Sequence, residues 1–147
     1  RETAYAGILK TSPDIGMYTS VETGDCSIRN AFAANDAVSF GSIINAYTQP
    51  FLLLYNHRKD RGYRMEAFAK AIRQSAAKPV CIGVIGEHKK ACARYMQRTT
   101  GIRAQAVERP KEWIQAQNVR HVLCAGNIKG EGRQFLEEMI EEARQNV

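Results

Sequence analysis

The sequence predicts an α/β domain of the Rossmann-like, three-layer type, in which a mostly parallel sheet carries helices on both faces. Strand-like apolar runs and helical patterns alternate about five times along the 147 residues, which is typical of repeated βα units. The run over residues 51–55 is continuously apolar, as expected for a strand buried on both faces. Polar turns follow the strands directly, and such turns hold ligands in open α/β sheets.

The strands are predicted from short apolar runs that end at polar or glycine-containing turns. A leading helix over 2–10 and a hairpin with its turn at 22–25 come first. The strands of the βα repeats are then expected over 28–34, 51–55, 80–85, 101–107 and 119–124. Residues 1–147 are therefore expected to form one domain, with 1–26 as the leading helix and hairpin and 27–147 as the βα repeats.

The helices are predicted from apolar side chains at three- and four-residue spacing. They are expected over 37–47, 63–77, 88–98, from Pro110 onward, and over 133–144. Asp36 is expected to cap the first of them, because a carboxylate at the N-cap accepts from free backbone N–H groups. Pro110 suits the first turn of the helix that it begins. Pro79 is expected to end the helix over 63–77.

Composition limits the classes of function without choosing one. The net charge of +6 allows nucleic acid, an anionic membrane surface, or ligands that carry phosphate or carboxylate. Lys89, Lys90, Arg94 and Arg98 form a basic face on the helix over 88–98, which is usually a solvated face. The four cysteines show no C-x-x-C or zinc-finger spacing, so buried thiols are expected rather than disulfides. The chain begins at Arg1, already within a predicted helix, which suggests a piece of a longer protein.

The first polar turn contains Asn30, Asn35 and Asp36, between the end of a strand and the start of a helix. Asparagine side chains both donate and accept hydrogen bonds, which suits an adenine edge or a ribose. The same side chains also form local bonds with the backbone. The residue types alone leave both roles open.

The second turn, over 56–61, follows the most apolar strand, and Arg64 lies one helical turn further on. Arg58, Arg61 and Arg64 beside a helix N-terminus make a candidate anion site, because guanidinium binds phosphate or carboxylate as a bidentate fork. Asp60 either orients these arginines or holds a ribose hydroxyl. A functional role is favoured here over a solvated charged loop, because loops set on a rigid scaffold often carry function.

The third turn, over 126–132, contains Asn127, Lys129 and Gly130. Its glycines permit close approach of a ligand to the backbone. The turn is not a P-loop, because the order G-x-x-x-x-G-K-[ST] is absent. The sequence also contains no H-E-x-x-H, no G-x-S-x-G and no cluster of acidic metal ligands, so no metal site is predicted.

These three turns resemble a known family in their order and spacing. The matching motifs are Ala33-Ala34-Asn35-Asp36, Asn56-x-Arg58-x-Asp60-Arg61-x-x-Arg64 and Gly126-Asn127-Ile128-x-Gly130. Together they look like the C-terminal region of the poly-γ-glutamate capsule synthetase ligase subunit (CapB type). That family belongs to the Mur ligase superfamily, which also includes folylpolyglutamate synthetases. The resemblance extends over most of the chain.

The resemblance implies an ATP-dependent ligase that makes γ-linked poly-glutamate. In such enzymes ATP phosphorylates a carboxylate, and an amine then attacks the acyl phosphate. This chain would be the C-terminal lobe, inactive alone, while a central ATPase domain absent from this sequence would hold Mg²⁺ and the P-loop. The other implied partners are glutamate, poly-γ-glutamate and membrane subunits of capsule synthesis, which would place the complex at the cytoplasmic side of a membrane.

The resemblance also assigns roles to residues, none of them catalytic. The implied nucleotide contacts are Asn30, Asn35, Asp36 and Asp60. The implied phosphate or glutamate contacts are Arg58, Arg61, Arg64, Asn127, Lys129 and Gly130. One departure from the family is Asn30, since many Mur-type ligases have Asp at this point.

Two other classes of function are consistent with the residues. One is a stand-alone module that binds nucleotides or acidic metabolites. The other is a nucleic-acid-binding α/β domain, which the charge of +6 allows. Because the basic residues are not gathered on one evident stripe of the sequence, no nucleic-acid partner is expected.

Overall fold

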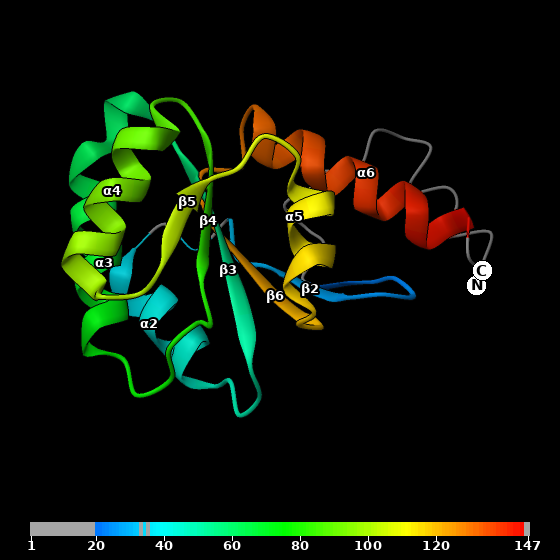
Figure 1. The fold of residues 1–147 in the computed structure, drawn as a ribbon, viewed down its shortest axis with the longest axis horizontal. Helices are drawn as coiled ribbons and strands as arrows, with labels where there is room; N and C mark the ends of the chain where they lie inside the picture. Colours follow the sequence, from blue (N-terminus) through cyan, green and yellow to red (C-terminus); the bar gives the residue numbers. More distant parts are fainter. Residues whose placement is uncertain (1–19, 33, 35, 146–147) are drawn as a thin grey trace.

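The computed structural model describes residues 20–32, 34 and 36–145 (Figure 1). The helix expected over 2–10 lies outside the described residues, as does the candidate residue Asn35. The strand expected before the hairpin is described only from Ser20.

One six-stranded sheet forms the centre of the domain, in the order β1-β2-β6-β3-β4-β5. Its strands are β1 (Ser20–Glu22), β2 (Ser27–Asn30), β3 (Phe51–His57), β4 (Ile82–Gly86), β5 (Ala104–Ala106) and β6 (His121–Gly126). Only the hairpin strand β1 pairs antiparallel, with β2, and all other pairings are parallel. The expected mostly parallel sheet is thus confirmed.

Helices cover both faces of this sheet, which confirms the three-layer arrangement (Figure 1). The helices α2 (Ala37–Asn45), α3 (Gly62–Gln74) and α4 (Lys89–Thr100) pack on one face. The helices α5 (Pro110–Gln117) and α6 (Glu131–Gln145) pack on the other. A short 3-10 helix, η2 (Lys59–Arg61), precedes α3.

The boundaries differ from expectation where local hydrogen bonds end an element. Strand β2 stops at Asn30 rather than at residue 34, because the Asn30 Oδ1 accepts from the Phe32 backbone N–H at 3.1 Å and turns the chain. Helix α3 stops at Gln74 rather than 77. The Lys78 ammonium donates to the carbonyl oxygens of Ile72, Arg73 and Ser75, which satisfies acceptors at the helix end.

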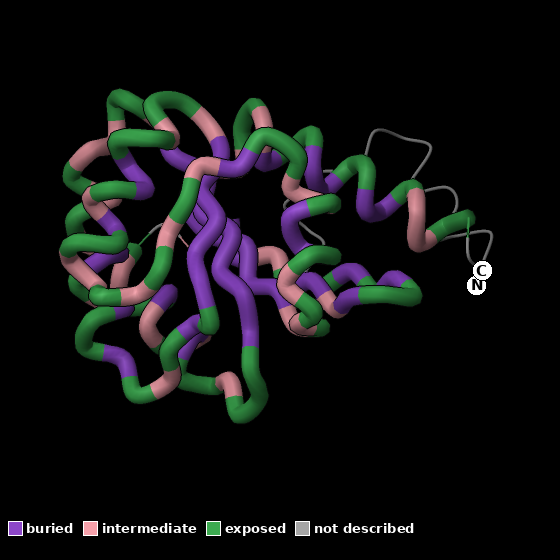
Figure 2. Tube along the Cα trace, in the orientation of Figure 1, coloured by how far each residue is buried: buried purple, intermediate pink, exposed green. Residues whose placement is uncertain are grey.

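The core has two parts, one on each side of the sheet, and Figure 2 shows the buried strands between them. Every residue of β3 is buried. Leu52 and Leu54 pack toward α5 and α6, whereas Leu53 and Tyr55 pack toward α2, α3 and α4. This alternation explains the continuous apolar run, because both faces of a central parallel strand are covered.

All four cysteines are free and buried, as expected. Burial raises the pKa of the Cys92 thiol to about 12. None of the helices described is both long and apolar enough to cross a membrane.

Candidate functional site

The three polar turns meet at one edge of the sheet. In the parallel register, Asn30 at the end of β2 pairs with Cys124 of β6, and Asn56 of β3 pairs with Gly126. Beyond β2 and β3 the chain turns to the face that carries α2 and α3, whereas beyond β6 it turns to α6 on the opposite face. Where the connections after neighbouring strands lead to opposite faces of the sheet, they form a topological switch point, and open α/β sheets bind ligands there. We call this end of the sheet, where the parallel strands terminate, the carboxyl edge.

The first turn is organised by two side chains that bond to nearby backbone. Asn30 is half-buried and accepts from Phe32 at its Oδ1. Asp36 is exposed and caps α2, accepting from the Ser39 backbone N–H at 2.8 Å and from the Ser39 hydroxyl at 3.0 Å. These hydrogen bonds hold the pKa of the Asp36 carboxyl below its usual value. The expected capping role is confirmed, and nucleotide contacts by Asn30 and Asp36 stay predictions.

The second turn begins later than expected, because Asn56 and His57 belong to β3. Arg58 forms an ion pair with Asp60, with 3.0 Å between Nη2 and Oδ2. Asp60 thus contacts an arginine, and its predicted contact with a nucleotide stays a prediction. Arg61 occupies the N-cap position of α3 and makes no side-chain capping bond, and Arg64 follows within the first turn of that helix. The sheet edge thus carries three guanidinium groups within seven residues.

The third turn is held by Asn56, which opens the motif of the second turn but to which the sequence assigned no role. The Asn56 Nδ2 donates to the Lys129 carbonyl oxygen at 2.7 Å and also to that of Asn127. The Asn56 side chain is buried, and a Cβ added to Gly132 would lie 2.5 Å from its Nδ2. Asn127 closes the turn from within, because its Oδ1 accepts from the Lys129 backbone N–H at 2.8 Å. Lys129 and Gly130 remain exposed.

His57 is a second residue of this segment to which the sequence assigned no role. Its side chain lies at the end of β3 and is 7% exposed. Its Nδ1 lies 2.8 Å from the Glu87 carbonyl oxygen, which can only accept, so Nδ1 carries the hydrogen. Neither the His57 Nε2 nor the Arg61 Nε, both of them buried atoms, has a hydrogen-bond partner among the described residues. Two buried nitrogen atoms of the segment over 57–61 therefore remain without a protein partner.

A fourth turn, after β4, completes the carboxyl edge. Glu87 accepts from the Lys59 backbone N–H at 3.0 Å and so ties the second turn to the fourth. Lys89 is not part of a solvated face, contrary to expectation, since it reaches Glu108 at 3.2 Å and Glu131 at 3.3 Å. Partial burial lowers the pKa of Lys89, but the bonds to both carboxylates outweigh it and raise the pKa. The polar residues that follow Gly86 directly follow a strand, so the rule that identified the other three turns also applies to this one.

The described residues hold no set of ligands suited to Mg²⁺. No three His, Cys, Asp or Glu side chains within them lie close enough together to bind a metal ion. The acidic residues of the three turns, Asp36, Asp60 and Glu131, are already engaged with Ser39, Arg58 and Lys89. Magnesium chemistry therefore cannot be assigned to residues of this part of the chain.

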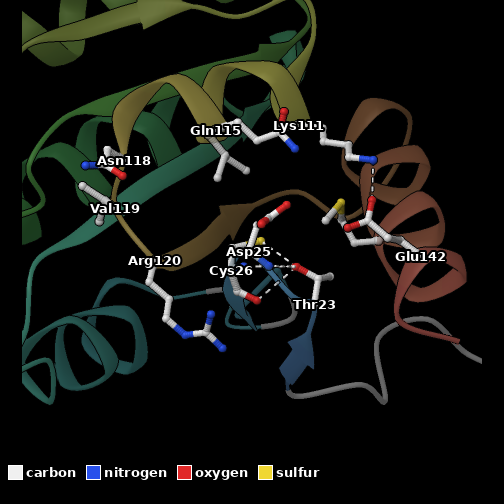
Figure 3. A pocket seen from close by; sticks show the side chains of 11 residues that line it. Thr23, Asp25, Cys26, Lys111, Gln115, Asn118, Val119, Arg120 and Glu142 are labelled. Atoms are coloured by element: carbon white, nitrogen blue, oxygen red, sulfur yellow. Dashed lines mark hydrogen bonds and ion pairs between the residues drawn. The ribbon is translucent and has the colours of Figure 1, made fainter. Parts of the chain in front are cut away.

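A hollow of about 450 Å³ lies at the opposite edge, near the beginnings of β2 and β6 (Figure 3). The side chains that line it include Thr23, Asp25, Asn118, Arg120 and Met139. Its charged groups are largely satisfied, since Lys111 pairs with Glu142 and Arg120 pairs with Glu22. None of the three turns lines this hollow.

Comparison with known families agrees with this geometry. The model described as "Poly-gamma-glutamate synthase CapB C-terminal domain" matches residues 18–142. The chain belongs to this family. The match covers all three turns and confirms the resemblance drawn from their motifs. Among curated proteins, no sequence matches the chain.

Solved structures of ligases share the fold. A folylpolyglutamate synthase from Thermotoga maritima superposes with a TM-score of 0.62 at 16% identity, over 98% of this chain and 36% of that one. UDP-N-acetylmuramate-alanine ligase MurC from the same organism gives 0.53 at 12% identity, over 83% of this chain and 27% of that one. A domain assigned to a UDP-N-acetylmuramate:L-alanyl-γ-D-glutamyl-meso-diaminopimelate ligase from Haemophilus ducreyi gives 0.54 at 12% identity, over 84% and 98%. The fold is thus that of Mur ligase C-terminal domains, and the chain spans about a third of the synthase.

Proposed function

We propose that this chain is the C-terminal lobe of an ATP-dependent ligase that builds γ-linked poly-glutamate. The observation that supports this most is the gathering of the three family motifs at one cation-rich edge of the sheet. The lobe would be inactive alone and would close onto a central ATPase domain of the longer protein. That domain would supply the Mg²⁺ ligands and the P-loop, since the described residues offer neither.

The reaction would proceed in two steps. ATP transfers its γ-phosphoryl group to a carboxylate, which releases ADP. The amine of a second glutamate then attacks the acyl carbon, loses a proton and expels phosphate. Both steps bring several negative charges together, so fixed positive groups in a closed site would stabilise them. Closure of a mobile lobe would also exclude water from the acyl phosphate.

The carboxyl edge would contribute binding and orientation. Arg58, which pairs with Asp60, would present its guanidinium to a phosphate or a glutamate carboxylate. Arg61 and Arg64 would add charge at the start of α3, where the helix dipole also favours anions. Asn30 and Asn35 would lie toward the nucleotide, and the turn with Asn127 and Lys129 toward glutamate. Membrane subunits of capsule synthesis, at the cytoplasmic side, are the partners expected for the assembled enzyme.

The test is an Arg58→Ala substitution in the full-length protein, with glutamate-dependent ATP hydrolysis as the readout. Loss of one charge-assisted contact should lower turnover about 10- to 100-fold, corresponding to roughly 1.5–3 kcal/mol. Arg144→Ala is the matched control, because Arg144 is exposed, lies in the last turn of α6 away from the carboxyl edge, and pairs with Glu141. Unchanged melting with unchanged turnover in the Arg58 variant would refute the assignment. Tight ATP binding by the 147-residue chain alone would favour a stand-alone nucleotide-binding module instead.

A further inference from the structure

Charge is segregated between the two faces of the domain. Residues 58–103, which include α3 and α4, contain twelve Lys and Arg but only three Asp and Glu. Residues 104–145, which include α5 and α6, contain six Lys and Arg and seven Asp and Glu. The cations that α3 and α4 carry are gathered on one face of the domain, because the two helices lie side by side (Figure 1).

The two faces also differ in how their cations are neutralised. In residues 104–145, five of the six cations pair with a carboxylate, and only Lys129 has none among the described residues. In residues 58–103, only Arg58 and Lys89 pair with a described carboxylate. The α3–α4 face is thus a field of uncompensated positive charge, which attracts a polyanion.

The helix α4 carries the most regular part of this field. Lys90, Arg94 and Arg98 are exposed and lie four residues apart, on one side of the helix. Like charges at this spacing repel one another, and Lys90 adds a cation to a helix N-terminus that has no acidic residue in its first turn. The arrangement weakens the helix unless an anion relieves it. We call Lys90, Arg94 and Arg98 the α4 stripe.

The α4 stripe begins at the carboxyl edge and leads away from it. Helix α4 follows the turn after β4, so Lys90 lies nearest the proposed site and Arg98 farthest. Successive cations are about 6 Å apart along the helix axis, at 1.5 Å per residue. A polyanion that leaves the site in this direction would meet one cation at each step.

We propose that the α4 stripe binds the growing poly-γ-glutamate chain as it leaves the site. This inference rests on the proposed function, which makes that polymer the product. A γ-linked residue has two more backbone C–C bonds than an α-linked one, so an extended chain presents one carboxylate about every 6 Å. This interval matches the spacing of the stripe. Duplex DNA carries one charge per about 1.7 Å and matches it less well.

The test measures binding of a fluorescein-labelled γ-linked glutamate decamer to the full-length protein by fluorescence anisotropy, without ATP. The variant carries Lys90→Gln, Arg94→Gln and Arg98→Gln. The matched control removes three paired cations from the other face, with Arg109→Gln, Arg133→Gln and Arg144→Gln. The stripe variant should bind the decamer about tenfold more weakly, as expected for three exposed ion pairs, and its Kd should depend less on salt. Its melting temperature should change little, because the loss of repulsion offsets the loss of the Arg98 cation from the last turn of α4.

Equal decamer affinity in the stripe variant and the control would overturn the inference. So would tighter binding of the wild-type protein to duplex DNA or to phosphatidylserine vesicles at the same salt concentration, because the face would then serve another anion. Failure of the proposed ligase function would be seen separately, as absent glutamate-dependent ATP hydrolysis in the wild type. The binding measurement does not depend on that turnover.

Discussion

The Asn56→Asp substitution removes two hydrogen-bond donors from the junction of β3 and the β6–α6 turn while leaving the shape of the side chain nearly unchanged. The Asn56 Nδ2 donates to the carbonyl oxygens of Asn127 and Lys129, and the residue is 2% exposed. An oxygen in its place would face two acceptors. Two lost hydrogen bonds and two unsatisfied carbonyl groups should together lower the free energy of unfolding by about 3–4 kcal/mol. For a chain of this size, that corresponds to a fall of about 10 °C in Tm.

Urea unfolding at pH 7, followed by circular dichroism, measures this loss. Asn127→Asp is the matched control, because Asn127 acts through its Oδ1 as an acceptor, which aspartate retains. The control should therefore stay within about 0.5 kcal/mol of the wild type. Burial should raise the pKa of the introduced carboxyl in the folded state, so the deficit should shrink as pH falls toward about 4. A loss below about 1 kcal/mol at pH 7 would refute the assigned clamp.

Three further substitutions or treatments test other parts of the structure. Gly126→Ala should destabilise the fold by roughly 2 kcal/mol or more, because Gly126 has φ +102° and an added Cβ would lie 2.4 Å from the Asn56 carbonyl oxygen. Gly41→Ala is the control and should stabilise the fold slightly, because Gly41 lies within α2 with open space around the added Cβ. Thermal melts of the two variants measure the difference. Lys89→Met should cost about 1 kcal/mol in urea unfolding through loss of its bonds to two carboxylates, and Lys90→Met should cost nothing. A thiol reagent at pH 8 should leave Cys92 unmodified in the native protein, because burial raises its pKa to about 12 and so lowers the thiolate fraction; rapid labelling would contradict this.

The fold was predictable because its signals are local and repeated. The continuous apolar run that forms β3 and the periodic apolar faces of α3 and α6 each report burial directly. Element ends were less predictable, because hydrogen bonds between side chains and the nearby backbone decide them, and hydrophobic periodicity does not record these bonds. Lys78 ends α3 in this way, and Asn30 ends β2.

The turns that form the candidate site were predictable, but the hydrogen bonds and ion pairs that connect them were not. Residue type and position after a strand identified Arg58 and Asn127, since such turns converge in a parallel sheet. The roles of Asn56 and Lys89 depend on partners 73 and 42 residues away along the chain, which no local pattern records. The charge segregation was missed for the same reason, because α3 and α4 are interrupted in sequence by β4.

The most direct test of the central claim is an amide NMR titration with this domain labelled segmentally in the full-length protein. Mg-ADP is added first and glutamate second. Chemical-shift changes are expected to cluster at Asn30, at residues 58–64 and at residues 127–130. Unchanged amide chemical shifts at all three turns at saturating ligand would contradict the proposed site. Shift changes confined to the hollow around Thr23, Asn118 and Arg120 would contradict it as well (Figure 3).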